Sequence, residues 1–126
     1  PGRAYVYFIY GNHYCFNVVT GNEGEGEAVL VRALEPVSGI ELMQKRRGNK
    51  TINNLTNGPG KLCQSLKIDL SLNGISLQKP PLFIANGNFL SGEKIAVSSR
   101  IGISKGQDKQ LRFYIQYNPY VSGTRS

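Results

Sequence analysis

The sequence contains no tryptophan, one methionine, one histidine and two cysteines in 126 residues. Cys15 and Cys63 are far apart in the chain, no CxxC pattern occurs, and His13 is the lone histidine. A structural zinc site or a disulfide framework needs several such residues at short, regular spacings. The sequence therefore predicts neither, and we expect two reduced, half-buried thiols in an intracellular protein.

Long apolar runs are also missing. No stretch approaches the roughly 20 apolar residues that a membrane helix needs, and the start has no signal-peptide pattern. We therefore expect one soluble domain with one core and no membrane association. The chain begins at Pro1 rather than at methionine, which is compatible with removal of an initiator residue, with processing, or with an upstream segment.

Acidic residues are few. Asp and Glu number 8 against 15 Lys and Arg, which gives a formal net charge of +7 and an isoelectric point near 9.6. A basic surface favours an anionic partner, and nucleic acid is the first candidate. Charge alone does not decide this, because many basic proteins bind no polyanion.

The clearest local pattern is a β-hairpin near the start of the chain. Residues 4–20 are apolar and β-favouring on both sides of Gly11-Asn12, which predicts two antiparallel strands around a short connection. The run Ala28–Leu34 is apolar except for Arg32, and its valines favour a buried strand. The glycine-rich residues 21–26 between them predict a flexible turn.

Two short helices are predicted next. Ser38 and Glu41 have the spacing of a capping box, which predicts a helix from Gly39 to Arg47. Residues 48–58 are expected to form a loop, and Pro59 is expected to open a second helix that runs through Lys67. Four later strands are predicted, at Leu82–Ala85, Ile95–Val97, Arg100–Ile103 and Leu111–Tyr117. This order favours a mainly β (α+β) fold with an antiparallel, curved or partly closed sheet and helices on one side.

Four of the seven tyrosines lie in the predicted hairpin. Because alternate residues of a strand share a face, Tyr5 and Tyr7 point the same way. They are either ordinary sheet aromatics or a surface on which bases stack. Tyr10 lies beside Gly11 at the hairpin tip, where a large ring suits insertion into a base stack.

Arg32 interrupts an apolar run, and a cation there needs a partner or an opening. It either pairs with a carboxylate in the core or lies beside a pocket floor, where it holds an acid or a phosphate.

Four segments in collinear order, PGRAYVYFIYGNHYCFN, VLVRALEP, LTNGPGKLCQSL and LRFYIQYNPYVS, resemble motifs of the alkyladenine (3-methyladenine) DNA glycosylase family. The resemblance implies a monofunctional base-excision repair enzyme that hydrolyses the N-glycosidic bond of flipped-out alkylated or deaminated purines, of the 3-methyladenine and hypoxanthine type. It implies an open, Greek-key, barrel-like antiparallel sheet similar to the carboxy-terminal domain of methionyl-tRNA formyltransferase. It also implies no metal, no organic cofactor, a monomer acting on damaged double-stranded DNA, and a location in the cytoplasm, nucleoid or nucleus.

The resemblance also assigns roles to four residues. Tyr7 matches the tyrosine that stacks on the flipped base, and Tyr10 matches the tyrosine that fills the gap left in the duplex. Asn17 matches the asparagine that disfavours guanine by crowding its 2-amino group. Arg32 matches the arginine next to the catalytic water.

Other residues are expected to contact DNA. The resemblance implies that Asn12 and His13 fall at hairpin positions near the minor groove. Lys61 lies at the start of the second predicted helix, a plausible phosphate site. Salt-dependent phosphate contacts are expected from Lys45, Arg46, Arg47, Lys61 and Arg100. For Lys45, Arg46 and Arg47 the alternative is that they lie in solvent at the end of the first predicted helix and contact no phosphate.

The resemblance breaks at the general base. In the family this glutamate lies in an E-x-Y motif upstream of the positions that match Pro1-Gly2, and no Glu-x-Tyr occurs here. We expect residues 1–126 to form a single domain, incomplete at its N-terminal side, of a longer glycosylase. The alternatives are a noncatalytic nucleic-acid-binding module or an inactive fragment of the glycosylase.

Overall fold

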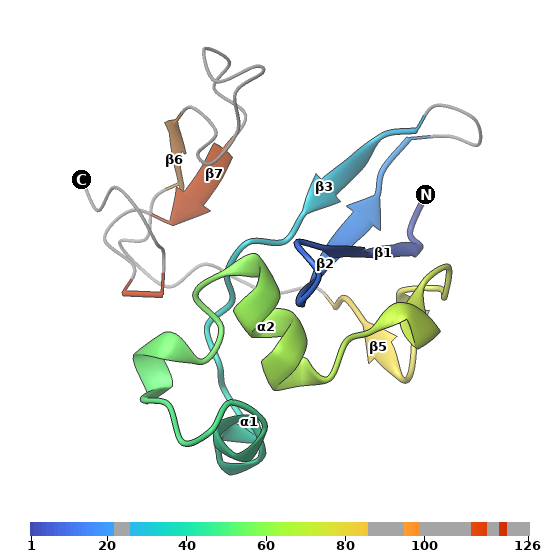
Figure 1. The fold of residues 1–126 in the computed structure, drawn as a ribbon. Helices are drawn as coiled ribbons and strands as arrows, with labels where there is room; N and C mark the ends of the chain where they lie inside the picture. Colours follow the sequence, from blue (N-terminus) through green and yellow to red (C-terminus); the bar gives the residue numbers. More distant parts are fainter. Residues whose placement is uncertain (22–25, 86–94, 99–111, 116–118, 121–126) are drawn as a thin grey trace.

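The computed structural model of the chain describes residues 1–21, 26–85, 95–98, 112–115 and 119–120. Figure 1 shows the arrangement of its helices and strands. In chain order they are β1 (Ala4–Ile9), β2 (His13–Val19), β3 (Ala28–Leu30), α1 (Ile40–Arg46), the 3-10 turn η1 (Ile52–Asn54), α2 (Pro59–Leu66), the 3-10 turn η2 (Leu70–Leu72), β4 (Gln78–Lys79), β5 (Leu82–Phe83), β6 (Ile95–Ser98) and β7 (Arg112–Ile115). The predicted strand Arg100–Ile103 lies outside the described residues.

The predicted hairpin is confirmed. β1 and β2 pair antiparallel from Ala4 opposite Val18 to Ile9 opposite His13. The connection is Tyr10-Gly11-Asn12, and φ is +56° at Tyr10 and +73° at Gly11. Positive φ at both central residues marks the type I′ turn that matches the twist of paired strands. The tyrosine is therefore part of the turn itself, one residue earlier than the expected Gly11-Asn12 centre.

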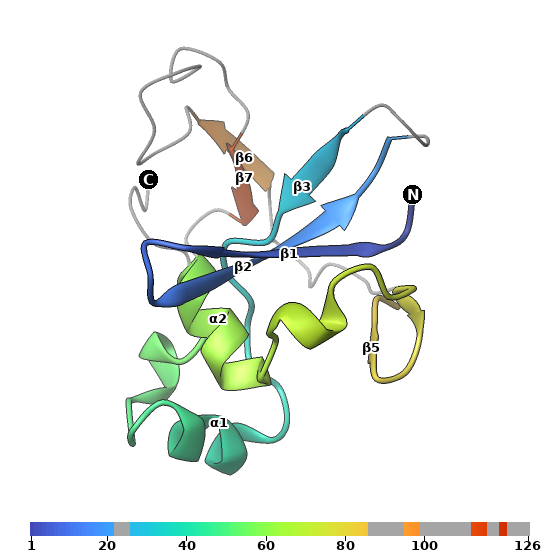
Figure 2. The ribbon, with the colours of Figure 1, turned by 45° about the vertical axis from the view of Figure 1, so that its right-hand side comes forward.

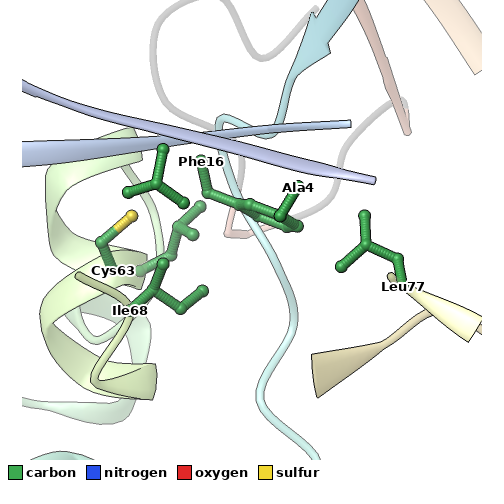
Figure 3. Close-up of a cluster of buried hydrophobic side chains, with 7 residues drawn as sticks. Ala4, Phe16, Cys63, Ile68 and Leu77 are labelled. Atoms are coloured by element: carbon green, nitrogen blue, oxygen red, sulfur yellow. The ribbon is translucent and has the colours of Figure 1, made fainter. Parts of the chain in front are cut away.

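The core lies between this hairpin and α2. Cys63 and Ile68 lie on one side of Phe16, and Leu77 lies on the other (Figure 3). In both ribbon views α2 lies between the hairpin and α1 (Figure 1, Figure 2). Buried members of the core cluster are Ala4, Val6, Phe16, Leu62, Cys63, Ile68 and Leu77.

The outer edge of β1 is also covered. The backbone N–H of Ala4 donates to the carbonyl of Ile75 at 2.9 Å, and that of Leu77 donates to Gly2 at 2.8 Å. Further along, the N–H of Val6 donates to Oδ1 of Asn73 at 2.9 Å. A strand edge with satisfied N–H groups holds its register firmly. β1 is thus fixed from both sides.

The strand expected over Ala28–Leu34 forms only at Ala28–Leu30, and the expectation that it is buried is wrong. β3 ends at Leu30, and Val29 and Leu34 remain 56% and 38% exposed. Within the described residues β3 pairs only with β2, so it is an edge strand rather than a central one. Beyond it, Leu34 is tied by its N–H to the carbonyl of Thr56, and this bond draws the segment toward α2.

Both helices form close to their predicted limits, but the first does not begin as expected. Gly39 is the N-cap of α1, with φ +71° and no side-chain cap hydrogen bond, so the predicted capping box of Ser38 and Glu41 is wrong. Glycine adopts a left-handed backbone without strain and replaces the side-chain cap. For α2, the expected start at Pro59 is confirmed.

The α+β class with antiparallel pairing and short helices is confirmed. Among the described residues the pairing divides into three sheets: β1-β2-β3, β4-β5 and β6-β7. In the described part of the chain they do not close into a barrel, and the similarity to the formyltransferase domain stays a prediction. No helix of the described residues has both the length and the apolar content that crossing a membrane requires.

Candidate functional site

The two faces of the β1–β2 hairpin differ in chemistry. Val6 and Phe16, which are directly opposite each other, face α2 and the core. Because side chains alternate, the next cross-strand pair, Tyr7 and Cys15, belongs to the other face. The same alternation assigns Tyr5 and Asn17 to that face. We call Tyr5, Tyr7, Cys15 and Asn17 the aromatic face.

On the aromatic face, two tyrosine rings lie beside a buried amide. The ring centroids of Tyr5 and Tyr7 are 5.4 Å apart with their planes tilted by 37°, and Tyr5 is 46% exposed. Asn17 is only 7% exposed, and its Nδ2 donates to the carbonyl of Tyr5 at 3.2 Å. A buried amide that is fixed by a backbone hydrogen bond has a defined orientation. The arrangement offers a ring surface next to a rigid polar group.

Tyr7 is the more enclosed of the two tyrosines. Burial, followed by its interaction with the side chain of Cys15, raises the pKa of its hydroxyl above the ordinary value of 10.0. The phenol is therefore neutral at physiological pH. A neutral ring with an accessible face can stack on a base or on a cationic heterocycle.

The tip of the hairpin is a second, separate part of the candidate site. Tyr10 is 81% exposed, although it stands in the turn at φ +56°. That conformation is unusual for a bulky residue and costs free energy that a glycine would not lose. Asn12 and His13 follow it and are also exposed. The tip therefore carries an exposed ring on a strained turn, and the role of this ring as a wedge stays a prediction.

His13 connects the tip to α2. A Cβ atom added at Gly60 would lie 2.7 Å from Nδ1 of His13. The histidine ring therefore lies directly on the first turn of α2, where Lys61 is exposed to solvent. This contact brings Asn12, His13 and Lys61 to one end of the molecule.

Beside this contact lies an open pocket of about 320 Å³ between the hairpin and α2. Its polar lining combines the basic Lys67 with the carboxylate of Asp69. Hydrogen bonds from Ser71 lower the pKa of Asp69, so the group is anionic at neutral pH. The lining residues are Asn12, His13, Tyr14, Gly60, Cys63, Gln64, Lys67, Ile68 and Asp69.

Two of the expected phosphate contacts have internal partners instead. Nη1 of Arg46 donates to the carbonyl of Ser65 at 2.9 Å. Arg47 donates to Oε1 of Gln64 at 2.9 Å and to the carbonyl of Asn54 at 3.1 Å. These bonds join α1 to α2 and to the preceding loop, so both arginines have a structural role. Arg100 lies outside the described residues.

The predicted site residues thus form two groups. Tyr7 and Asn17 share the aromatic face, whereas Tyr10, Asn12, His13 and Lys61 gather around the tip and the start of α2. Arg32 is half-buried and lies two residues after Leu30, the β3 partner of Asn17. Its role beside a catalytic water stays a prediction.

Sequence reasoning did not assign roles to Cys15 and Gly60. Alternation along β2 groups Cys15 with Asn17, but the place of Cys15 opposite Tyr7 depends on the register of the hairpin. For Gly60 the signal was weaker. A glycine inside a predicted helix costs stability, which points to close packing but does not identify the neighbour.

Comparison with known proteins identifies one family that matches nearly the whole chain. The family described as Methylpurine-DNA glycosylase (MPG) matches residues 1–119. Three relatives carry the provisional name 3-methyladenine DNA glycosylase. The protein from Carboxydothermus hydrogenoformans is 54% identical over 97% of this chain and 64% of its own length. The one from Methanoculleus marisnigri is 56% identical over 96% and 65%, and the one from Prosthecochloris aestuarii is 51% identical over 97% and 59%.

The chain thus spans about 59–65% of the length of these curated relatives. The match is nevertheless collinear over nearly all of its residues, and it includes the hairpin, the β3 segment and α2. The chain belongs to the methylpurine-DNA glycosylase family.

Proposed function

We propose that this chain is the damage-recognition body of a DNA glycosylase that releases alkylated or deaminated purines during base-excision repair. The observation that carries the proposal is the hairpin, which presents an aromatic face with a buried asparagine and, at its tip, an 81% exposed tyrosine. Its proposed partner is double-stranded DNA that contains a damaged purine.

In this proposal Tyr10 enters the duplex where the damaged nucleotide has left it. Flipping a base costs a few kcal/mol, and less where damage has weakened its pairing or stacking. An inserted ring opposes the return of the base. The turn suits this task because the β1–β2 pairing holds it on both sides.

The flipped base would stack on Tyr7. A purine that carries positive charge from alkylation gains a cation–π contribution of about 0.5–2 kcal/mol on such a ring, and an unmodified purine does not. Asn17 would exclude guanine by crowding its 2-amino group. Its hydrogen bond to the Tyr5 carbonyl supports this role, because a fixed amide cannot rotate away.

Hydrolysis at the sugar carbon needs a carboxylate general base to activate water. None of the acidic residues in the 126-residue sequence stands in a Glu-x-Tyr motif. We therefore propose that these residues supply recognition, with Arg32 beside the water, and that base release requires the Glu-x-Tyr segment of the family in addition.

The test is release of 3-methyladenine and hypoxanthine from duplex DNA. The chain is assayed alone and fused to the Glu-x-Tyr segment of a family member, with the Glu→Gln form of that segment as the matched control. We expect release only from the fusion with intact glutamate. Absence of release from a folded fusion, or equal release from both fusions, would contradict the proposal.

A noncatalytic nucleic-acid-binding module is the second candidate, because the net charge of +7 and the exposed tyrosines would serve DNA binding without catalysis. It is distinguished by selectivity. Such a module would bind damaged and undamaged duplexes equally, whereas the recognition body binds the damaged duplex more tightly.

A further inference from the structure

The contact between His13 and Gly60 is closer than any side chain at position 60 would permit. An added Cβ would lie 2.7 Å from Nδ1, 3.0 Å from Cγ and 3.3 Å from Cβ of the histidine. Real Cβ atoms essentially never approach another heavy atom within 3.0 Å. The absence of a side chain on α2 is therefore what allows the ring to lie there.

Rotation about the Cα–Cβ bond of His13 would carry Nδ1 and Cγ away from an added methyl group, but it would also take the ring off α2. Cβ of His13 stays in place at 3.3 Å, so a tight contact with the start of β2 remains. His13 is the first residue of β2 and pairs with Ile9. On the other side, α2 is anchored by Leu62, which is completely buried. A larger residue at position 60 must therefore dislodge the His13 ring from α2 or shift the strand end and the turn next to it.

We propose that Gly60 is a positioning residue: it seats His13 on the first turn of α2 and thereby sets the wedge turn, Tyr10-Gly11-Asn12, relative to Lys61. The inference rests on the proposed function, since it concerns how the wedge meets DNA. The wedge turn and Lys61 would contact the same rigid duplex, so the distance between them must be fixed. The direct contact of the His13 ring with Gly60, with no side chain between them, fixes this distance.

The variants are Gly60→Ala, His13→Ala and the double variant Gly60→Ala/His13→Ala. Gly58→Ala is the matched control. It places the same methyl group two residues earlier, at an extended position where the nearest atom is Cδ of Lys61 at 3.4 Å. Binding to a duplex with an abasic site and to the undamaged duplex is measured well below the melting temperature, together with thermal melting.

We expect Gly60→Ala to lower the ratio of damaged to undamaged affinity by about tenfold, within the range that one stacking contact contributes. Gly58→Ala should retain the wild-type ratio. The double variant should match His13→Ala in this ratio and melt no lower than it, because alanine favours a helix over glycine once the clash is gone.

Two results would overturn the inference. One is an unchanged affinity ratio in Gly60→Ala. The other is that Gly60→Ala lowers the affinity ratio and the melting temperature by the same amount in the His13→Ala background as in the wild type. Failure of the proposed function would give a different result, because the wild-type chain itself would then show no preference for the damaged duplex. The melting temperatures of the double variant and of His13→Ala would still test the contact between His13 and Gly60.

Discussion

Leu34 and Thr56 are joined by two hydrogen bonds that run in opposite directions. The N–H of Leu34 donates to the carbonyl of Thr56 at 3.0 Å, and the hydroxyl of Thr56 donates to the carbonyl of Leu34. Thr56 is 1% exposed and lies three residues before α2. The bonds therefore hold the segment after β3, which contains Arg32, against the residues that precede α2.

Removal of the Thr56 hydroxyl should destabilise the fold. Thr56→Val keeps the shape but leaves the Leu34 carbonyl without this donor, and we expect the free energy of unfolding to fall by about 1–2 kcal/mol. Thr56→Ser keeps the donor and should lose less. Urea unfolding of the three proteins measures this. A serine variant that loses as much as the valine variant would show that the hydroxyl bond is not what matters.

Lys61 and Arg46 should separate DNA binding from structure. Lys61 is exposed at the start of α2, so Lys61→Ala should reduce the slope of log affinity against log salt by about 0.9 while melting stays unchanged. Arg46→Ala removes the donor to the Ser65 carbonyl and should lower the melting temperature with little change in slope. Titrations at several salt concentrations decide this, and the reverse pattern would contradict the assignment.

The hairpin and α2 were predictable because their signals are local. Alternating aromatics around Gly11 and a proline before a helical pattern determine structure within a few residues. The length of β3 was not predictable, because its pairing with β2 joins residues that are distant in the sequence and that no local pattern aligns. The role of Gly39 as N-cap was missed for a different reason: Ser38 and Glu41 fit a capping pattern, but the left-handed glycine between them starts the helix instead.

The candidate site also has a part that local sequence patterns predict and a part that they do not. Alternation groups Tyr5 with Tyr7 along β1 and Cys15 with Asn17 along β2. It does not place these two pairs on one face, because that depends on the register, and a two-residue turn at Gly11-Asn12 would have set Tyr7 opposite Phe16 instead of Cys15. The contact of His13 with Gly60 joins residues 47 positions apart in the sequence. No local pattern reveals that approach, since it follows from how α2 packs beneath the hairpin.

Stability should fall at alkaline pH because of Cys63. Burial, and secondarily the nearby Cys15, raises the pKa of its thiol from 9.0 to about 12. Below the ordinary value both states hold the proton and the contribution is fully present. As the pH rises from 9.0 toward about 12, the unfolded state releases the proton while the folded state keeps it, so stability is lost.

We therefore expect the free energy of unfolding of Cys63→Ala to depend less on pH in this window than that of the wild type. The alanine variant is less stable at neutral pH because it leaves a cavity, so the comparison concerns slopes and not absolute values. Urea unfolding at a series of alkaline pH values measures both slopes. Parallel curves would contradict the assignment to Cys63.

The proposed recognition of damaged DNA depends most on the two tyrosines of β1 and its turn, and a pair of alanine variants separates their roles. Tyr7 is half-buried on the aromatic face, so Tyr7→Ala should lower both the melting temperature and the affinity for damaged duplex. Tyr10 is 81% exposed, so Tyr10→Ala should leave melting nearly unchanged.

The most direct test is the affinity of the chain for a duplex with an abasic site, measured for the wild type and for Tyr10→Ala alongside their melting curves. No catalysis is required, so the 126-residue chain is used as it is. We predict that Tyr10→Ala binds this duplex more weakly by about 1–3 kcal/mol, the contribution of one stacking contact. If Tyr10→Ala instead destabilises the fold as much as Tyr7→Ala and leaves the affinity for the abasic duplex untouched, both rings are packing residues and the hairpin is not the damage-recognition element.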